Sequence, residues 1–173
     1  MITLVPPSLS LHSSWWEAAQ EFNGARLHGF SVHGFEHLDL GSPEGFGPWL
    51  ALQQRTITDP PEGWVPATMF WIIDDAQPQQ VLGSLSFRHE LNDFLREEGG
   101  HIGYGVRPSA RGRGVATAAL EAALAYAPSL GLDRVLVTCD EDNEPSRKTI
   151  ERCGGVLEDI RSAKRRCWID CAA

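Results

Sequence analysis

A short run of glycines and arginines carries the residue types that bind an anion. The segment between Glu98 and Glu121 contains no acidic residue, although the whole chain has a formal charge of -8. It contains three arginines: Arg107, Arg111 and Arg113. Gly112 and Gly114 lack a Cβ atom, so a phosphate can approach the main chain there. An alanine-rich segment with helical spacing follows, and the first amides of a helix are unpaired and partly positive. The run predicts a phosphate or pyrophosphate site.

Two common phosphate-binding loops do not fit this run. A P-loop has Lys followed by Ser or Thr after its last glycine, whereas Gly114 is followed by Val115. A dinucleotide-binding loop has a third glycine three positions further on, where this chain has Thr117. The predicted strand also ends six residues before the turn that opens the helix. These differences point to a different phosphate-binding loop.

Periodicity predicts the elements that position this loop. Aromatic and β-branched residues predict strands at Thr68–Ile73, Val81–Arg88, His101–Val106, Val135–Cys139, Val156–Arg161 and Cys167–Cys171. Apolar spacing predicts helices at Gly114–Ala127 and Asn143–Arg152, with a helical turn at Leu91–Glu98. This order of elements predicts an α/β (α+β) fold, a mixed central sheet with helices on both faces.

The first 65 residues are expected to be helical, with irregular connections. Ser14 and Glu17 have the spacing of a capping box, and a second short helix is expected at Pro48–Gln54. The segment Gly24–Gly47 is rich in Gly and His and is expected to be a loop that faces the substrate.

Composition limits the class of protein. A chain of 173 residues with 42% hydrophobic residues is expected to form a single domain, residues 1–173. The acidic balance argues against nucleic-acid or membrane partners. The absence of a leader and of C-x-x-C pairs favours a cytoplasmic protein with free thiols. The loop histidines have no convincing ligand spacing, so no metal is expected: His28, His33 and His37.

The run at residues 101–118 resembles the signature of the GNAT acetyltransferases. That signature is Arg or Gln, two residues, Gly, one residue, then Gly or Ala, and this chain has Arg111-Gly112-Arg113-Gly114-Val115-Ala116. A second segment of the family is matched by Asn143, Ser146 and the helix end Glu151-Arg152-Cys153-Gly154. The two segments stand in register across residues 68–171, which would form the acetyl-CoA-binding core, with residues 1–65 on the acceptor side.

The resemblance implies the residues that bind the co-substrate acetyl-CoA. Amides of residues 112–117 would bind the pyrophosphate, and the free edge of strand His101–Val106 would pair with the pantetheine arm. An amide near Val106 would polarise the thioester carbonyl. The expected binding residues are Val106, Arg107, Arg111, Gly112, Arg113, Gly114, Val115, Ala116, Thr117, Asn143 and Ser146.

Acetyl transfer to an amine needs a proton acceptor, and the leaving thiolate benefits from a proton donor. His101 is the first candidate base because the family often has Glu at this point of the strand, and His89 and Glu90 are alternatives. The family's usual acid, a Tyr four residues after the Ser, is replaced by Ile150. Tyr104 or another donor would take this role, or the thiolate would leave with the help of solvent.

The sequence therefore predicts an N-acetyltransferase that transfers the acetyl group of acetyl-CoA to a primary amine of a small molecule or protein, by direct attack in a ternary complex. The replacement at Ile150 leaves open a non-catalytic acyl-CoA-binding or sensing domain. A nucleotide-binding regulatory module is a third interpretation of the same anion loop. A homodimer through the carboxy-terminal strands is an analogy with such folds.

Overall fold

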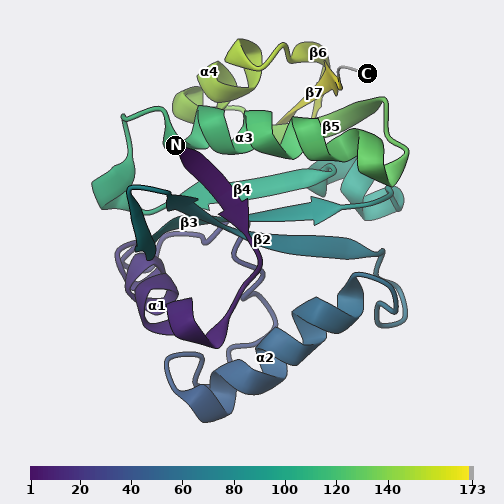
Figure 1. The fold of residues 1–173 in the computed structure, drawn as a ribbon. Coiled ribbons are helices and arrows are strands. Elements are labelled where there is room, and N and C mark those ends of the chain that lie inside the picture. The colour runs from purple at the N-terminus through teal and green to yellow at the C-terminus, as the bar shows by residue number, and fades with distance from the viewer. Residues whose placement is uncertain (172–173) are drawn as a thin grey trace.

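The computed structural model describes residues 1–171, which form one seven-stranded sheet (Figure 1). Its strand order is β1-β2-β3-β4-β5-β7-β6. The strands are β1 (Ile2–Val5), β2 (Ala67–Asp74), β3 (Gln77–Arg88), β4 (Ile102–Val106), β5 (Arg134–Asp140), β6 (Val156–Arg161) and β7 (Lys164–Asp170). Neighbouring strands are antiparallel except β4 and β5, which are parallel. The mixed sheet predicted from the sequence is confirmed.

Helices cover both faces of the sheet (Figure 1). One face packs against α1 (His12–Gln20) and α2 (Pro43–Thr56), and the other lies under α3 (Val115–Tyr126) and α4 (Glu144–Arg152). Shorter turns are η1 (Leu9–Leu11), the π-helical η2 (Leu95–Gly99), η3 (Pro108–Ala110) and η4 (Ala127–Leu130). No helix in residues 1–171 is long and apolar enough to cross a membrane.

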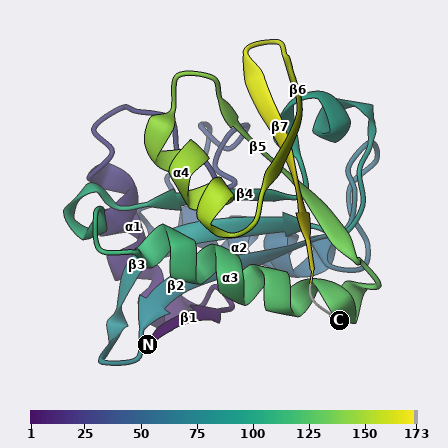
Figure 2. The same cartoon turned by 90° about the horizontal axis from the view of Figure 1, so that it is seen from above.

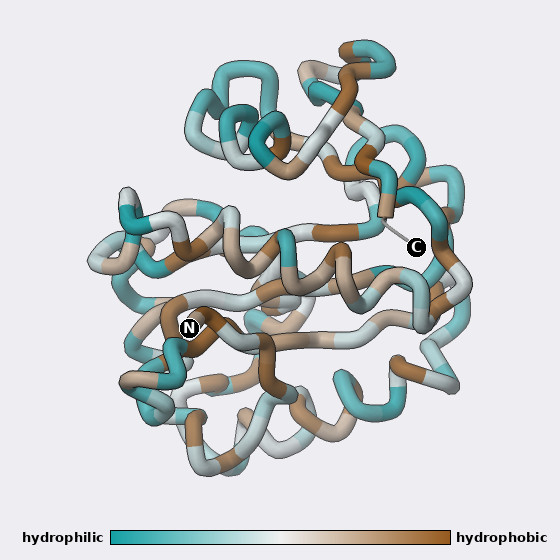
Figure 3. Tube along the Cα trace, turned by 45° about the horizontal axis from the view of Figure 1, so that its top comes forward, coloured by the Kyte–Doolittle hydropathy of each residue, from teal (hydrophilic) through white to brown (hydrophobic). Residues whose placement is uncertain are grey.

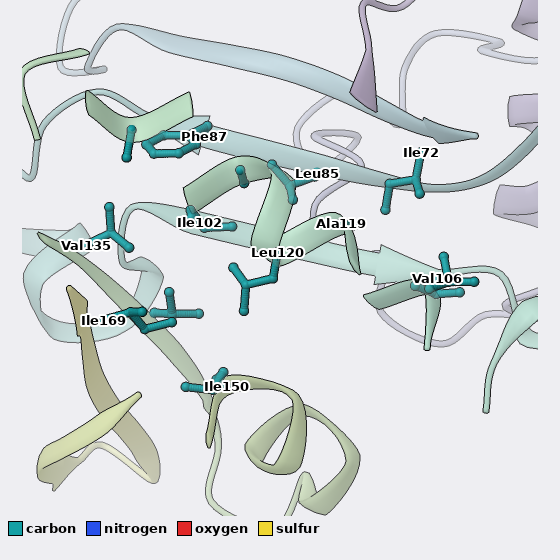
Figure 4. Close-up of a cluster of buried hydrophobic side chains, with 14 of the residues drawn as sticks. Ile72, Leu85, Phe87, Ile102, Val106, Ala119, Leu120, Val135, Ile150 and Ile169 are labelled. Carbon is teal, nitrogen blue, oxygen red and sulfur yellow. The ribbon is translucent and has the colours of Figure 1, made fainter. Parts of the chain in front are cut away.

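Each face of the sheet has its own hydrophobic core. Under α3 and α4 the core is aliphatic, and Leu120, Ile150 and Ile169 belong to it (Figure 4). Under α1 and α2 it is aromatic, and Trp15 stacks on Trp71 at 5.4 Å between ring centroids. Hydrophobic stretches run along the central strands, while many peripheral connections are hydrophilic (Figure 3). The two cores hold the sheet and its strand ends in fixed positions.

The two parallel strands β4 and β5 separate soon after they meet (Figure 2). Only Ile102 and Val137 are paired between them, although β4 pairs with β3 along its whole length. Alternate residues of an antiparallel strand direct their main-chain groups to opposite edges. Arg107 donates its amide to Leu82 of β3, so the main-chain groups of Tyr104 and Val106 point to the edge that faces the separation.

The amino-terminal part differs from the prediction in three places. Residues 2–5 form the edge strand β1. The sequence did not predict this strand, because its run is only four residues long and two prolines follow it. Ser14 lies inside α1 and its Oγ accepts a hydrogen bond from the Val81 amide, so the predicted capping box is wrong. The second helix starts at Pro43 rather than Pro48, because the Ser42 Oγ accepts from the Gly45 amide and caps it.

Candidate functional site

The glycine-arginine loop presents a row of free main-chain amides. None of the amides of residues 112–117 donates to an acceptor within residues 1–171. Gly112 and Gly114 have φ of +73° and +76°, and a Cβ at either position would meet nothing within 4 Å. Positive φ is costly for residues other than glycine, so the loop depends on both glycines. The amides lie at the start of α3, where the helix dipole favours an anion.

A buried ion pair fixes the segment that leads into this loop. Arg107 is 6% exposed and its Nε donates to the Glu21 carboxylate of α1's carboxy-terminal end at 2.9 Å. The Ser109 amide donates to the same carboxylate at 3.0 Å. The Arg107 guanidinium lowers the pKa of Glu21 to about 2. Arg107, expected to contact the co-substrate, is therefore committed to Glu21, and its role here is to hold the loop.

The two remaining arginines of the loop have different surroundings. Arg111 donates its Nε to the Val106 carbonyl at 3.0 Å and lies 5.1 Å from the centroid of the Phe22 ring. This contact closes the carboxy-terminal end of β4 against the loop. Arg113 is exposed and makes no hydrogen bond or ion pair within the described residues, 1–171. Arg113 is the arginine left available for an anion.

A cavity of about 140 Å³ lies where β4 and β5 separate. From β4 it is lined by Gly103 and Tyr104, and from β5 by Cys139. Asn143 and Ser146, both predicted to bind the co-substrate, line it from the start of α4. The cavity therefore joins the two sequence segments that were singled out separately.

Two of these residues touch across the cavity. The Tyr104 Oη lies 2.8 Å from the Ser146 Oγ, and burial raises the pKa of Tyr104 to about 12. The Asn143 Oδ1 accepts from the Ser146 amide at 3.2 Å, which caps α4 and fixes the serine. Ile150 is fully buried in the core beside Leu120 (Figure 4). Tyr104 is thus the phenol that lines the cavity, and the helix position usual for the acid belongs to the core.

His101 does not lie as the sequence analysis expects. It is 4% exposed, and its Nδ1 accepts a hydrogen bond from the Leu136 amide at 2.9 Å. The neutral ring therefore carries its hydrogen on Nε2, so neither nitrogen is free to accept a proton. Burial lowers the pKa of His101 to about 4. This geometry favours a structural role, in which the ring joins β4 to β5 just before the strands separate.

The alternative bases, His89 and Glu90, do not line the cavity. The His89 Nε2 lies 2.7 Å from the Thr68 Oγ1, and its amide donates to the Pro66 carbonyl. Glu90 is exposed in the turn after β3. The structure brings neither residue to Tyr104, Asn143 or Ser146.

A family model provides the decisive comparison. Residues 42–156, more than half of the chain, match the model described as an acetyltransferase (GNAT) domain. The chain belongs to the GNAT acetyltransferase family. Comparison with curated proteins gives no match.

Solved GNAT structures share the fold at low sequence identity. Mycobacterium smegmatis RimJ in complex with CoA-disulfide is 20% identical, with a TM-score of 0.67 over 97% of this chain and 80% of that one. The microcin C7 self-immunity acetyltransferase MccE, in complex with acetyl-CoA and AMP, is 18% identical, with a TM-score of 0.66 over 98% and 92%. The spermidine/spermine N-acetyltransferase SpeG of Vibrio cholerae is 18% identical, with a TM-score of 0.58 over 98% and 95%. These likenesses establish the fold.

Sequence reasoning missed several charged or titratable residues that line the cavity of this GNAT domain. They are Arg26, His28, Arg88, Glu98, Asp140 and Lys164. The glycine-rich loop brings two of them in, because it crosses directly over β4. A Cβ on Gly29 would lie 2.5 Å from the Tyr104 Cα, and one on Gly105 would lie 2.5 Å from the His28 carbonyl oxygen. Gly29 of the loop and Gly105 of β4 permit this contact. The sequence signal for it was the expectation that Gly24–Gly47 forms a loop facing the substrate.

Proposed function

We propose that this protein is an acetyl-CoA-dependent N-acetyltransferase that acts on a primary amine by direct attack in a ternary complex. The single observation that supports this most is the row of free amides at residues 112–117, which follow the carboxy-terminal end of β4, a strand that also lines the cavity through Gly103 and Tyr104. The exposed loop, its open glycines and the unpaired Arg113 fit a diphosphate group. The main-chain groups of Tyr104 and the amide of Val106, on the open edge of β4, fit an extended pantetheine chain laid along the strand.

Bound acetyl-CoA supplies the acetyl group, and the chain's own groups position it and move protons. In this proposal the Val106 amide, on the open edge of β4, donates to the carbonyl oxygen where negative charge develops. Tyr104 keeps its proton at neutral pH because its pKa is raised to about 12, and it gives that proton to the leaving sulfur. Ser146, 2.8 Å away, orients the phenol.

We assign the proton acceptor to the acceptor side of the cavity, where His28 lies. His28 is exposed, and partial desolvation, followed by the charge of Arg26, lowers its pKa. The imidazole is therefore neutral at pH 7 and able to take a proton, directly or through water. Asp140 lines the same cavity but is paired with Lys164.

Two measurements test the function. Thermal unfolding with acetyl-CoA, CoA, ATP and NAD should show stabilisation by the first two only, because a ligand that binds the native state raises its melting temperature. Release of free thiol from acetyl-CoA, followed with a panel of amines, should depend on the amine. Stabilisation by ATP or NAD and not by CoA would contradict the proposal and favour a nucleotide-binding module.

The buried Ile150 supports a second candidate, a non-catalytic acyl-CoA-binding or sensing domain. The family's usual acid is absent from that helix position, so such a domain would keep the anion loop without turnover. The same thiol assay separates the two candidates. Tight CoA binding without amine-dependent thiol release across a broad panel would favour the sensing domain.

A further inference from the structure

Arg88 ends β3 and directs its guanidinium group into the cavity. A Cβ on Gly103 of β4 would lie 3.1 Å from the Arg88 Nη1, so the guanidinium covers the middle of β4. Arg88 shares a face of β3 with Ser84 and Ser86, the face that packs against α1 and α2. The group therefore lies on the face of α1 and α2, whereas Tyr104, paired with Leu85, belongs to the opposite face, and both residues line the cavity where β4 and β5 separate.

Arg88 has no carboxylate partner within residues 1–171. None of the ion pairs formed there includes it, and the only hydrogen bond of its guanidinium group runs from Nη1 to the Gly99 carbonyl at 3.1 Å. Burial lowers the pKa of Arg88 to about 10. Arg88 is half-buried, and a charge that loses part of its hydration without gaining a partner carboxylate points to a ligand.

Two arginines that are more deeply buried than Arg88 show how this chain otherwise stabilises such charges. Arg107 is 6% exposed and pairs with Glu21, and Arg166 is 5% exposed and pairs with both Glu158 and Asp159. Arg88 alone among these three has its Nε and Nη2 free of partners within the described part of the chain. That edge of a guanidinium binds a carboxylate through two parallel hydrogen bonds.

The remaining charges around the cavity leave this edge available. Lys164 and Asp140 pair with each other, and Arg26 is exposed at the mouth without an ion pair in residues 1–171. Glu98 also lines the cavity but forms no ion pair with Arg88. The unpaired groups are thus two arginines and one carboxylate.

We propose that the acceptor amine carries a carboxylate and that Arg88 binds it, so that the amine points toward Tyr104. This inference rests on the proposed function and names its substrate class, an amino acid or another amine with a carboxylate a few bonds away. Arg88 determines specificity in this scheme: it orients the acceptor and takes no part in proton transfer.

The test uses amines of matched length: β-alanine, its amide, propylamine, 1,3-diaminopropane and O-phosphoethanolamine. Wild-type kcat/KM, measured by thiol release, should be at least about tenfold higher for β-alanine than for the other amines, as expected for a paired and enclosed charge. In Arg88→Met this preference should disappear while the affinity for CoA stays unchanged. Equal or higher kcat/KM for the uncharged, cationic or phosphorylated amines, or a preference that survives Arg88→Met, would overturn the proposal.

A binding measurement distinguishes failure of this inference from failure of the enzymatic assignment. With CoA saturating, β-alanine should raise the melting temperature of the wild type but not that of Arg88→Met, whether or not turnover occurs. An absence of this shift in the wild type would overturn the inference, while loss of CoA binding itself would overturn the proposed function. Without ligands, Arg88→Met should be at least as stable as the wild type, because it removes a half-buried charge that has no carboxylate partner within residues 1–171. A large loss of stability would instead show that Arg88 is structural.

Discussion

The Tyr104 Oη and the Ser146 Oγ lie 2.8 Å apart, although the two residues are 42 positions apart in the chain. Tyr104 belongs to β4 and Ser146 to the first turn of α4, so their contact spans the separation between the parallel strands. Both line the cavity, and burial keeps the phenol protonated. The pair therefore places a protonated phenol at the point where the two family segments meet.

The Tyr104→Phe variant, which removes the phenol hydroxyl, should lower kcat about 100-fold. This is the lower end of the usual range for losing a proton donor, and we expect it because a thiolate also leaves with the help of water. The affinity for CoA, measured by calorimetry, should change little. The matched control is Tyr126→Phe, since Tyr126 packs edge-on against Phe70 and Phe87 in the core and does not line the cavity. Wild-type kcat in Tyr104→Phe would show that the proton comes from elsewhere.

The anion loop should lose its ligand when Gly112→Val and Gly114→Val are combined. Both residues have positive φ, which costs other residues about 1–2 kcal/mol each, and the new side chains would project where a phosphate approaches the main chain. We expect CoA affinity to fall below detection by calorimetry.

The control for backbone strain is Gly131→Val, at the opposite end of the α3 segment. Gly131 also has positive φ, +75°, and open space around its Cβ position. Measured by urea unfolding, this variant should lose about as much stability as each substitution of the double variant. It should nevertheless bind CoA like the wild type. Unchanged affinity in the double variant would place the anion site elsewhere.

Much of the fold could be predicted because the strands from residue 67 onward and α3 have strong periodic patterns. Val81–Arg88 and Val135–Cys139 were predicted within β3 and β5, and the helix after Gly114 begins within one residue of its prediction. The failures are in the amino-terminal part, where tertiary contacts outweigh local signals. Ser14 has the spacing of a cap but bonds to Val81, which is 67 positions away in the chain.

The free amides of the candidate site could be predicted from the sequence, whereas the convergence of side chains from distant segments could not. Glycines before a helix indicate free amides from the sequence alone, and the structure places the Gly112–Thr117 amides as that pattern suggests. His28 reaches the cavity because its loop crosses β4, and Arg88 reaches it from the end of β3; no local pattern encodes this meeting. The predicted dimer through the carboxy-terminal strands stays a prediction.

The Glu21–Arg107 pair should make stability depend on pH. A carboxyl whose folded pKa is lowered, here from 4.5 to about 2, contributes stability above pH 4.5 that is lost as pH falls toward 2. Glu21→Gln should lower the free energy of unfolding by about 1–3 kcal/mol at pH 7, and the difference from wild type should shrink between pH 4.5 and 3. Urea titrations at pH 7, 5 and 3 measure this difference.

The control is Glu151→Gln, which removes the exposed pair with Arg147. Because an exposed pair of this spacing is screened by solvent, this variant should change stability little at any of the three pH values. A Glu21→Gln effect as small as that of the control would mean that the ion pair does not hold the loop.

His101→Asn separates a structural histidine from a catalytic one. The Asn Oδ1 can replace Nδ1 as acceptor for the Leu136 amide, so the variant should fold. His101 has a folded pKa of about 4, so the unfolded chain takes up a proton below pH 6.5 while the native protein does not. Between pH 6.5 and 4 the free energy of unfolding should therefore fall more in the wild type than in His101→Asn, by up to roughly 3 kcal/mol. Urea titrations of both proteins measure this difference. The pH profile of kcat should stay like that of the wild type, and a 100-fold loss of kcat with a shifted profile would restore His101 as the base.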